Sequence, residues 1–251
     1  MKRFLLAFCL TGWALAQPRY LAVLCYHQIH QKADTEMVTT PERFRQQLDF
    51  LHKQGYQTVN LEQAQAFLQD KLSAKEFPKP LLITFDDGYD GVYRYAYPQL
   101  KKHGMKGVVF LVVSQVDRLK PTPHLTQAQV REMDRSGVFE FGSHTYNMHI
   151  PIPERRAGGQ VSAAAIRRDL TRSREVLQGW LGKPVRSLAW PYGHYDESCL
   201  ELARESGFRL VFTTDYGYNL PGCGPWRIRR IRLSSDFDTV EVLRAKLETG
   251  G

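Results

Sequence analysis

Two short runs of this sequence carry side chains that could bind a divalent metal ion and activate water. Asp86 and Asp87 are adjacent carboxylates followed by Gly88, and His144 and His149 lie five positions apart in a second run. Imidazole and carboxylate groups are ligands of zinc and of other borderline divalent ions. Side chains of neighbouring residues diverge, so one carboxylate can bind a metal while the other faces its open side. Two histidines and one carboxylate leave coordination positions for water and substrate, which is typical of a catalytic site.

Each run also has an explanation without chemistry. An Asp can cap the helix that follows it while Gly88 forms the turn, and two loop histidines can simply make hydrogen bonds. His27, which follows an apolar run, could equally be a structural histidine at the rim of the fold. The combination of an Asp with two histidines in separate runs is what favours a metal site over these alternatives.

Apolar runs alternate with segments of helical spacing along the whole chain. Thr40 is a suitable helix N-cap, Pro41 suits the first helical position, and Gly55 ends that helix. The pattern predicts strands over residues 20–26, 57–60, 81–85, 107–113, 138–142, 187–190, 209–213 and 228–233. It predicts further helices over residues 61–69, 92–103, 126–135, about 162–181, 197–206 and near 237–248.

Strands that alternate with helices, several of them apolar on both faces, predict a parallel sheet covered by helices. Seven or eight βα units favour a distorted (β/α) barrel of about seven parallel strands, in the α/β class and in a single domain. The active site of a parallel barrel lies at the carboxyl ends of its strands. The following polar groups come directly after predicted strands: His27, Asp86 with Asp87, His144 with His149, and Pro191 with Tyr192.

The first residues have the features of a secretory signal peptide. Basic residues at positions 2 and 3 precede an apolar stretch over residues 4–16, which ends in Ala14-Leu15-Ala16. We therefore expect residues 1–16 to be a signal peptide cleaved near Ala16, residues 17–251 to form one domain, and the protein to be secreted or periplasmic. No later segment is long and uncharged enough to cross a bilayer, so no transmembrane anchor is expected.

Charge and cysteine content limit the partners and the covalent structure. The formal net charge of +8 falls to +6 without Lys2 and Arg3. This mild excess fits loose attraction to anionic envelope polymers, and no nucleic-acid partner is expected. Cys25, Cys199 and Cys223 allow one disulfide at most, and Cys199 with Cys223 is a conceivable pair. We expect a monomer.

Three runs in fixed order, TFDDGY, HTYNMH and Trp190 to Gly193, resemble the polysaccharide deacetylases of carbohydrate esterase family four, also called the NodB-like domain. The resemblance covers nearly all of the chain after the signal peptide. Leu24 to His27, the spacing of the two histidines, and the aromatic-Pro-Tyr-Gly run are most similar to the poly-β-1,6-N-acetylglucosamine deacetylases. The resemblance implies removal of N-acetyl groups from an acetylated glucosamine polysaccharide.

The resemblance also implies a divalent metal cofactor, zinc first, with cobalt, nickel or iron as alternatives, and a role for each matching residue. These roles are metal ligation by Asp87, His144 and His149, general base for Asp86, general acid for His27, an oxyanion donor in the backbone N–H of Tyr192, and substrate binding by Trp190, Pro191 and Tyr192.

Two positions depart from the wider family. Most members carry an Arg where this chain has Ala189, so another arginine must orient Asp86. The candidates are Arg186, Arg227, Arg229, Arg230 and Arg232. Most members also take their acid histidine from the last strand, and residues 231–233 contain none, which leaves that role to His27.

The substrate stays open at this point. A deacetylase with the same chemistry could act on peptidoglycan or chitin oligomers, because polymer choice depends on loops such as residues 114–125 and 151–160. The same site could also attack an acetyl ester. An alternative from another class is an inactive carbohydrate-binding protein on the same scaffold, although every group that the mechanism needs is present apart from the missing arginine.

Overall fold

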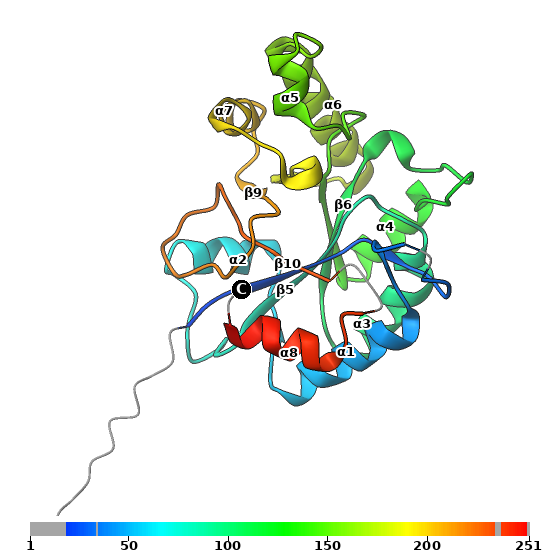
Figure 1. The fold of residues 1–251 in the computed structure, drawn as a ribbon, viewed down its shortest axis with the longest axis vertical. Coiled ribbons are helices and arrows are strands. Elements are labelled where there is room, and N and C mark those ends of the chain that lie inside the picture. The colour runs from blue at the N-terminus through cyan, green and yellow to red at the C-terminus, as the bar shows by residue number, and fades with distance from the viewer. Residues whose placement is uncertain (1–18, 34, 234–236, 250–251) are drawn as a thin grey trace, which may run out of the picture.

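A curled parallel β-sheet organises the chain (Figure 1). The computed structural model describes residues 19–33, 35–233 and 237–249, so the expected signal peptide and its cleavage point lie outside the described residues. The sheet runs in the order β10-β1-β5-β6-β7-β8-β9 with β4 added beside β5, and its pairings are parallel. Its strands are β1 (Ala22–Tyr26), β4 (Gln57–Thr58), β5 (Pro80–Phe85), β6 (Gly107–Leu111), β7 (Phe139–Ser143), β8 (Ser187–Ala189), β9 (Leu210–Phe212) and β10 (Ile231–Arg232).

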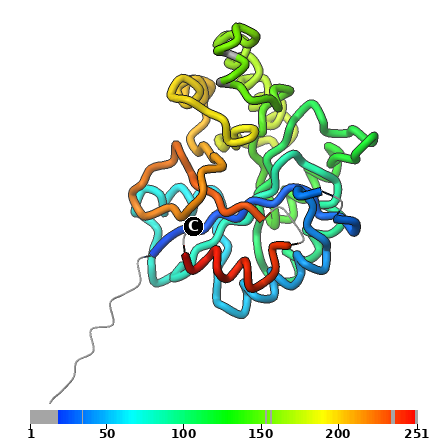
Figure 2. Tube along the Cα trace, viewed as in Figure 1, coloured from blue at the N-terminus to red at the C-terminus, as the bar shows by residue number. Residues whose placement is uncertain are grey.

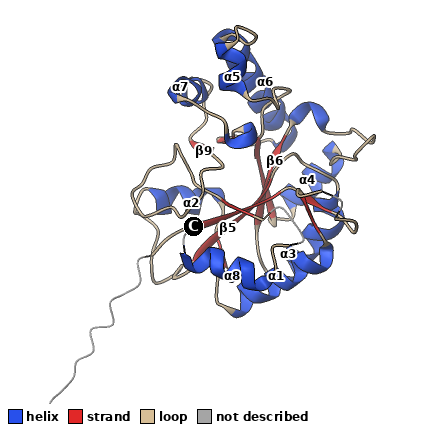
Figure 3. Cartoon of the chain, viewed as in Figure 1, coloured by secondary structure: helices blue, strands red, loops and turns tan. Residues whose placement is uncertain are grey.

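Helices cover the outside of this sheet (Figure 3). Helix α1 packs against α3 and α8 on one side, and α6 packs against α7 on another. No helix among the described residues combines the length and the apolar character that crossing a bilayer requires. The helices are α1 (Pro41–Lys53), α2 (Leu61–Leu68), α3 (Tyr97–His103), α4 (Gln127–Arg135), α5 (Ile152–Ala157), α6 (Ala163–Leu181), α7 (Glu197–Glu205) and α8 (Val240–Thr249), with π and 3₁₀ turns at Val92–Ala96, Val113–Gln115 and Pro191–Gly193.

The two ends of the described chain lie together. Figure 2 shows the first segment, in blue, running beside the last ones, in orange and red. Strand β1 pairs in parallel with β10, where Leu24 lies opposite Ile231, and α8 packs on α1. The carboxyl end of β1 is therefore surrounded by later strands, and the residue that follows β1 can meet residues from the end of the chain.

Alternate residues of the strands face two different sides of the sheet. In β6, Val109 and Leu111 pack with the cluster under α1, α3 and α4, while Val108 and Phe110 face the other side. The ring of Phe110 lies 4.9 Å from that of Phe212, although two strands separate β6 from β9 in the sheet. The sheet is thus curled around this second face, which is its inner face. At the carboxyl ends of the strands, this inner face leads to the polar groups of the site.

The expected fold class is confirmed, with a parallel curled sheet in one α/β domain. Within the described residues its edge strands β9 and β10 are not paired with each other, and Phe212 of β9 instead forms an isolated parallel bridge with Ile228, three residues before β10, so the barrel is distorted as expected. The Thr40 hydroxyl accepts the Arg43 N–H at 3.2 Å, which confirms that helix start. Three elements were not predicted: helix α5 and the two-residue strands β2 (Gln28–Ile29) and β3 (Val38–Thr39), which pair with each other.

The two cysteines of the conceivable disulfide lie in different surroundings. Cys199 is buried within α7, whereas Cys223 is exposed, and neither forms a disulfide with another described cysteine. The conceivable disulfide between Cys199 and Cys223 is therefore not formed in this structure.

Candidate active site and metal centre

The turn after β5 presents two carboxylates at the carboxyl end of the sheet. Asp87 has a φ of 70° and Gly88 a φ of 84°, so two consecutive residues adopt the left-handed conformation. Asp tolerates this region better than most residues, and Gly adopts it without cost. The Leu125 N–H donates to the Gly88 carbonyl at 2.8 Å, which ties the turn to a neighbouring loop. The backbone is fixed in a geometry that turns Asp86 and Asp87 in different directions.

Left-handed backbone recurs in all three runs that carry the site. Besides Asp87, Thr145 has a φ of 72° and Tyr192 a φ of 59°. A positive φ is a genuine outlier for a β-branched residue such as Thr, and such strain clusters at functional sites. Thr145 is held there by two bonds, its N–H to the Ser143 hydroxyl at 3.0 Å and its carbonyl to the Val113 N–H at 3.1 Å.

Asp87, His144 and His149 converge on one point, although they come from different loops. Asp87 Oδ1 lies 3.2 Å from His149 Nε2 and 3.6 Å from His144 Nε2. One ligand atom from each residue lies within 4.8 Å of the other two. The strand-end prediction therefore brings these three side chains together as expected.

The chemistry of these three groups fits a bound cation. The His144 Nδ1 lies 2.8 Å from the Ala189 carbonyl, which can only accept, so Nδ1 carries the proton. Burial lowers the pKa of His144 and keeps the ring neutral, so its Nε2 presents a lone pair toward Asp87. Asp87 Oδ1 is buried and accepts no hydrogen bond. The lone pairs of His144 Nε2 and Asp87 Oδ1 face each other and repel. A divalent metal ion between these two atoms would be coordinated by both and would remove the repulsion.

His149 is the more exposed member of the three. Its Nδ1 lies 3.3 Å from the Tyr192 hydroxyl, and the two rings are 4.7 Å apart. Burial would raise the pKa of Asp87, but His149 and His144 outweigh it and hold that pKa below its ordinary value. Asp87 is therefore charged at neutral pH, as a metal ligand must be.

Asp86 is held in a different way, by the guanidinium group of Arg230. Arg230 Nη1 and Nη2 each donate to one oxygen of Asp86 at 2.8 Å, and both side chains are buried. Arg230 Nε donates to the Thr213 carbonyl at 2.7 Å, which fixes the orientation of the guanidinium group. Burial would raise the pKa of Asp86, but Arg230 with His144 and His27 holds it well below its ordinary value. Of the five candidate arginines, Arg230 is the one that orients Asp86.

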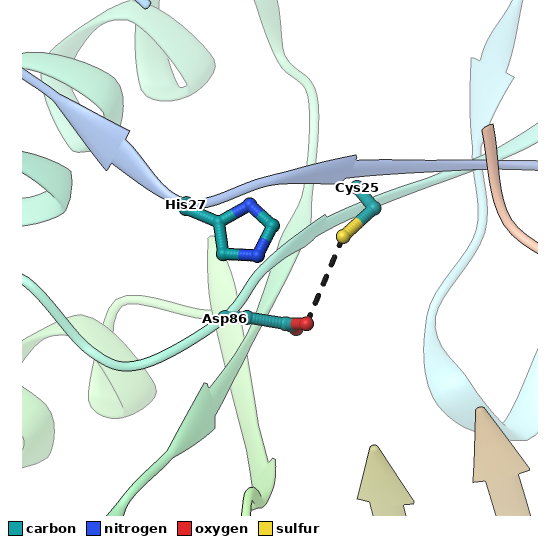
Figure 4. A group of neighbouring side chains, drawn as sticks. All are labelled: Cys25, His27 and Asp86. Atoms are coloured by element: carbon teal, nitrogen blue, oxygen red, sulfur yellow. Dashed lines mark hydrogen bonds between the residues drawn. The ribbon is translucent and has the colours of Figure 1, made fainter. Parts of the chain in front are cut away.

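His27 and Cys25 lie beside the Asp86 carboxylate, as Figure 4 shows. The Cys25 thiol lies 3.7 Å from Asp86 Oδ2 and donates to it, and burial raises the pKa of that thiol well above its ordinary value. Burial lowers the pKa of His27, while Asp86 and Asp87 act to raise it. The His27 Nδ1 is buried without a hydrogen-bond partner. Cys25 was not predicted here, although it lies two residues before His27 and so on the same face of the strand.

In the third run, Trp190 to Gly193, not all of the residues expected to contact substrate are exposed. Trp190 is fully buried among the side chains under α7, and Pro191 is buried as well. A fully buried indole has no face free to stack on a sugar, so the expected substrate contact by Trp190 is not possible in this structure. Tyr192 is 52% exposed and is the residue of this run that a substrate can reach.

A cavity of about 390 Å³ opens beside Asp87 and His149. The loop over residues 114–125, expected to influence polymer choice, forms much of its wall. Tyr89 of the TFDDGY run also lines this cavity, together with four residues to which the sequence analysis assigned no role: Gln115, Arg118, His124 and Asn147.

Comparison with known proteins agrees with the geometry of the site. A family model described as polysaccharide deacetylase matches residues 74–211, more than half of the chain. YxkH of Bacillus subtilis (strain 168), which is assigned to the same kind of enzyme, is 31% identical over 226 residues that cover 89% of this chain and 75% of YxkH. This chain belongs to the polysaccharide deacetylase family.

Relatives with more specific names are similar to this chain over most of its length. The poly-β-1,6-N-acetyl-D-glucosamine N-deacetylase of Staphylococcus aureus (strain MRSA252) is 27% identical over 92% of this chain and 79% of its own length. The structure of IcaB from Ammonifex degensii is 30% identical with a TM-score of 0.81, and covers 93% of this chain and 99% of that one. The Streptococcus pyogenes deacetylase PplD is 27% identical with a TM-score of 0.79, over 94% and 100%.

Proposed function

We propose that this polysaccharide deacetylase hydrolyses N-acetyl groups of N-acetylglucosamine residues, with poly-β-1,6-N-acetylglucosamine as its substrate. One observation carries the proposal: ligand atoms of Asp87, His144 and His149 lie within 4.8 Å of one another, directly beside an Asp86 that is paired with Arg230. Similarity to the S. aureus N-deacetylase and to IcaB supports the choice of polymer. The features of residues 1–16 support export of the protein to the periplasm or the medium.

Asp87, His144 and His149 would hold one divalent metal ion. Two nitrogen donors and one oxygen donor suit zinc, and also cobalt, nickel or iron. When bound, such an ion polarises a carbonyl group and lowers the pKa of water toward ~7. The contact of His144 with the Ala189 carbonyl fixes the tautomer that leaves Nε2 free for this role.

Asp86 acts as the general base. Its carboxylate is charged at neutral pH because Arg230 holds its pKa down, and it is oriented by two hydrogen bonds from one rigid guanidinium group. It removes a proton from the water that attacks the acetamide carbon. A base held in one orientation needs no reorganisation at the moment of proton transfer.

His27 acts as the general acid and gives a proton to the leaving amine. Burial lowers the pKa of His27, which makes its imidazolium a stronger acid, while the Asp86 and Asp87 carboxylates favour the charged form. Proton transfer of this kind contributes ~10²–10⁴ in rate. The backbone N–H of Tyr192, at a residue with φ of 59°, donates to the developing oxyanion.

Acetate release from defined substrates tests this function. Purified protein is incubated with β-1,6-linked and β-1,4-linked N-acetylglucosamine oligomers and with peptidoglycan fragments, each with and without a chelator. We expect chelator-sensitive acetate release that is fastest on the β-1,6-linked oligomer. Faster release from a β-1,4-linked substrate would overturn the choice of polymer, and no release from any of them would overturn the enzyme function.

A further inference from the structure

We infer that His124 is a specificity-determining residue, whose Nε2 accepts a hydrogen bond from a hydroxyl group of the sugar bound beside the metal centre. This inference rests on the proposed function for the identity of the substrate, but its evidence comes from a different part of the site. No role in metal binding or proton transfer is assigned to His124.

The tautomer of His124 is fixed by its own loop. Its Nδ1 lies 2.9 Å from the Thr122 carbonyl, which can only accept, so Nδ1 carries the proton and Nε2 is an acceptor. Burial lowers the pKa of His124, which supports the neutral ring. Nε2 makes no hydrogen bond within the described part of the chain, and the residue as a whole is 9% exposed. Nε2 itself is not among the fully buried polar atoms, so it is open to a ligand that can donate a hydrogen bond to it.

The position of His124 relative to the candidate metal ligands is fixed by backbone pairing. Tyr89 and His124 form an antiparallel bridge, and their rings lie 4.9 Å apart. The Asp90 N–H donates to the Pro123 carbonyl at 3.1 Å, beside the bond from Leu125 to the turn after Asp87. His124 is thus held against Tyr89, two residues along the chain from Asp87.

The cavity gives His124 access to the same ligand as the metal centre. One continuous cavity of about 390 Å³ is lined by Asp87, His149 and His124. Its wall also includes the Gln115 and Asn147 amides and Arg118. Hydrogen-bonding groups spread over a wall of this kind suit a neutral, hydroxyl-rich ring. Among them, His124 is an acceptor that cannot also donate, so it selects for a hydroxyl hydrogen.

Two substitutions separate hydrogen bonding from packing. His124→Phe keeps an aromatic ring against Tyr89 and removes the acceptor, whereas His124→Gln restores an amide oxygen. His52→Phe, at an exposed histidine in the last turn of α1, is the matched control. Two substrates are compared for each protein, a β-1,6-linked N-acetylglucosamine oligomer and 4-nitrophenyl acetate, which has no sugar hydroxyl.

We expect His124→Phe to lower kcat/KM for the oligomer about 10- to 100-fold, mainly through KM, because the bound sugar hydroxyl would be desolvated without an acceptor, and an unpaired donor costs that much. Hydrolysis of 4-nitrophenyl acetate and metal content should stay at the wild-type level, and His124→Gln should recover most of the loss. An oligomer kcat/KM within about twofold of wild type, or an equal loss on both substrates, would overturn the inference.

A binding measurement separates this inference from the proposed function. The two proteins compared are metal-loaded Asp86→Asn and the double variant that also carries His124→Phe. Calorimetric titration with the same oligomer measures the affinity of each without turnover. Weaker binding with His124→Phe supports the inference even if wild-type protein releases no acetate. Absence of acetate release would contradict only the proposed function. Equal affinity of the two proteins would contradict the role of His124 but not the proposed function.

Discussion

The two neighbouring carboxylates of the site are satisfied in opposite ways. Asp86 has both oxygens paired with the Arg230 guanidinium group at 2.8 Å, in a pair that is almost completely buried. Asp87 has an oxygen that is buried without a hydrogen bond and faces two imidazole nitrogens. One carboxylate is paired with a positive charge within the chain, and the other has an unpartnered oxygen beside donor atoms that suit a cation.

This difference separates the two roles by physical chemistry alone. A carboxylate that is already neutralised by a bidentate arginine gains little from a metal ion, but it is well placed to move a proton in a fixed direction. A carboxylate beside two neutral imidazoles has the donor set of a metal ligand. Adjacent residues of the same type therefore suit the different roles proposed for them, because their side chains reach different partners.

The largest effect is expected on the Asp87 side. His144→Ala removes one of three ligands, so both bound metal and acetate release should fall to background. Elemental analysis and an acetate assay measure these quantities, with His52→Ala as a control at an exposed histidine. Wild-type metal content in His144→Ala would remove His144 from the ligand set.

A smaller effect is expected from the acid on the Asp86 side. His27→Ala should lower kcat by ~10²–10⁴ while metal content is unchanged, because the side chain moves a proton and binds no metal. His30→Ala, at a nearby exposed histidine, should leave both quantities as they are in the wild type. An unimpaired rate in His27→Ala would mean that another group supplies the proton.

The pairing of Asp86 can be tested through stability. Arg230→Met leaves a buried carboxylate without a counter-charge, which should cost about 3–5 kcal/mol in the free energy of unfolding. Urea denaturation at neutral pH measures this cost. Arg167→Met is the control, because the pair of Arg167 with Glu205 is largely exposed and should contribute at most about 1 kcal/mol. An equal loss in both variants would mean that Asp86 does not depend on Arg230.

Much of the fold and half of the site could be predicted from the sequence. Asp86, Asp87 and His144 follow apolar runs, and the carboxyl ends of parallel strands meet at one mouth. Arg230 remained one of five candidates, because a side chain that crosses the inside of a curled sheet leaves no local pattern. The burial of Trp190 depends on packing against α7, which an aromatic-Pro run does not reveal.

Short elements and long-range contacts account for most of the other differences. Strands β2 and β3 have two residues each, too few to show an alternating pattern. No local pattern marks His124 as a site residue, because its place near Asp87 depends on a bridge to Tyr89, 35 positions earlier in the chain. Such contacts are visible only once the chain is folded.

Metal content in a matched pair of isosteric variants tests the division of roles most directly. Asp86→Asn and Asp87→Asn are loaded with zinc, dialysed and analysed alongside wild-type protein. We predict that Asp86→Asn keeps the wild-type metal content and releases no acetate, and that Asp87→Asn loses the metal. Loss of metal from Asp86→Asn with retention by Asp87→Asn would contradict the account.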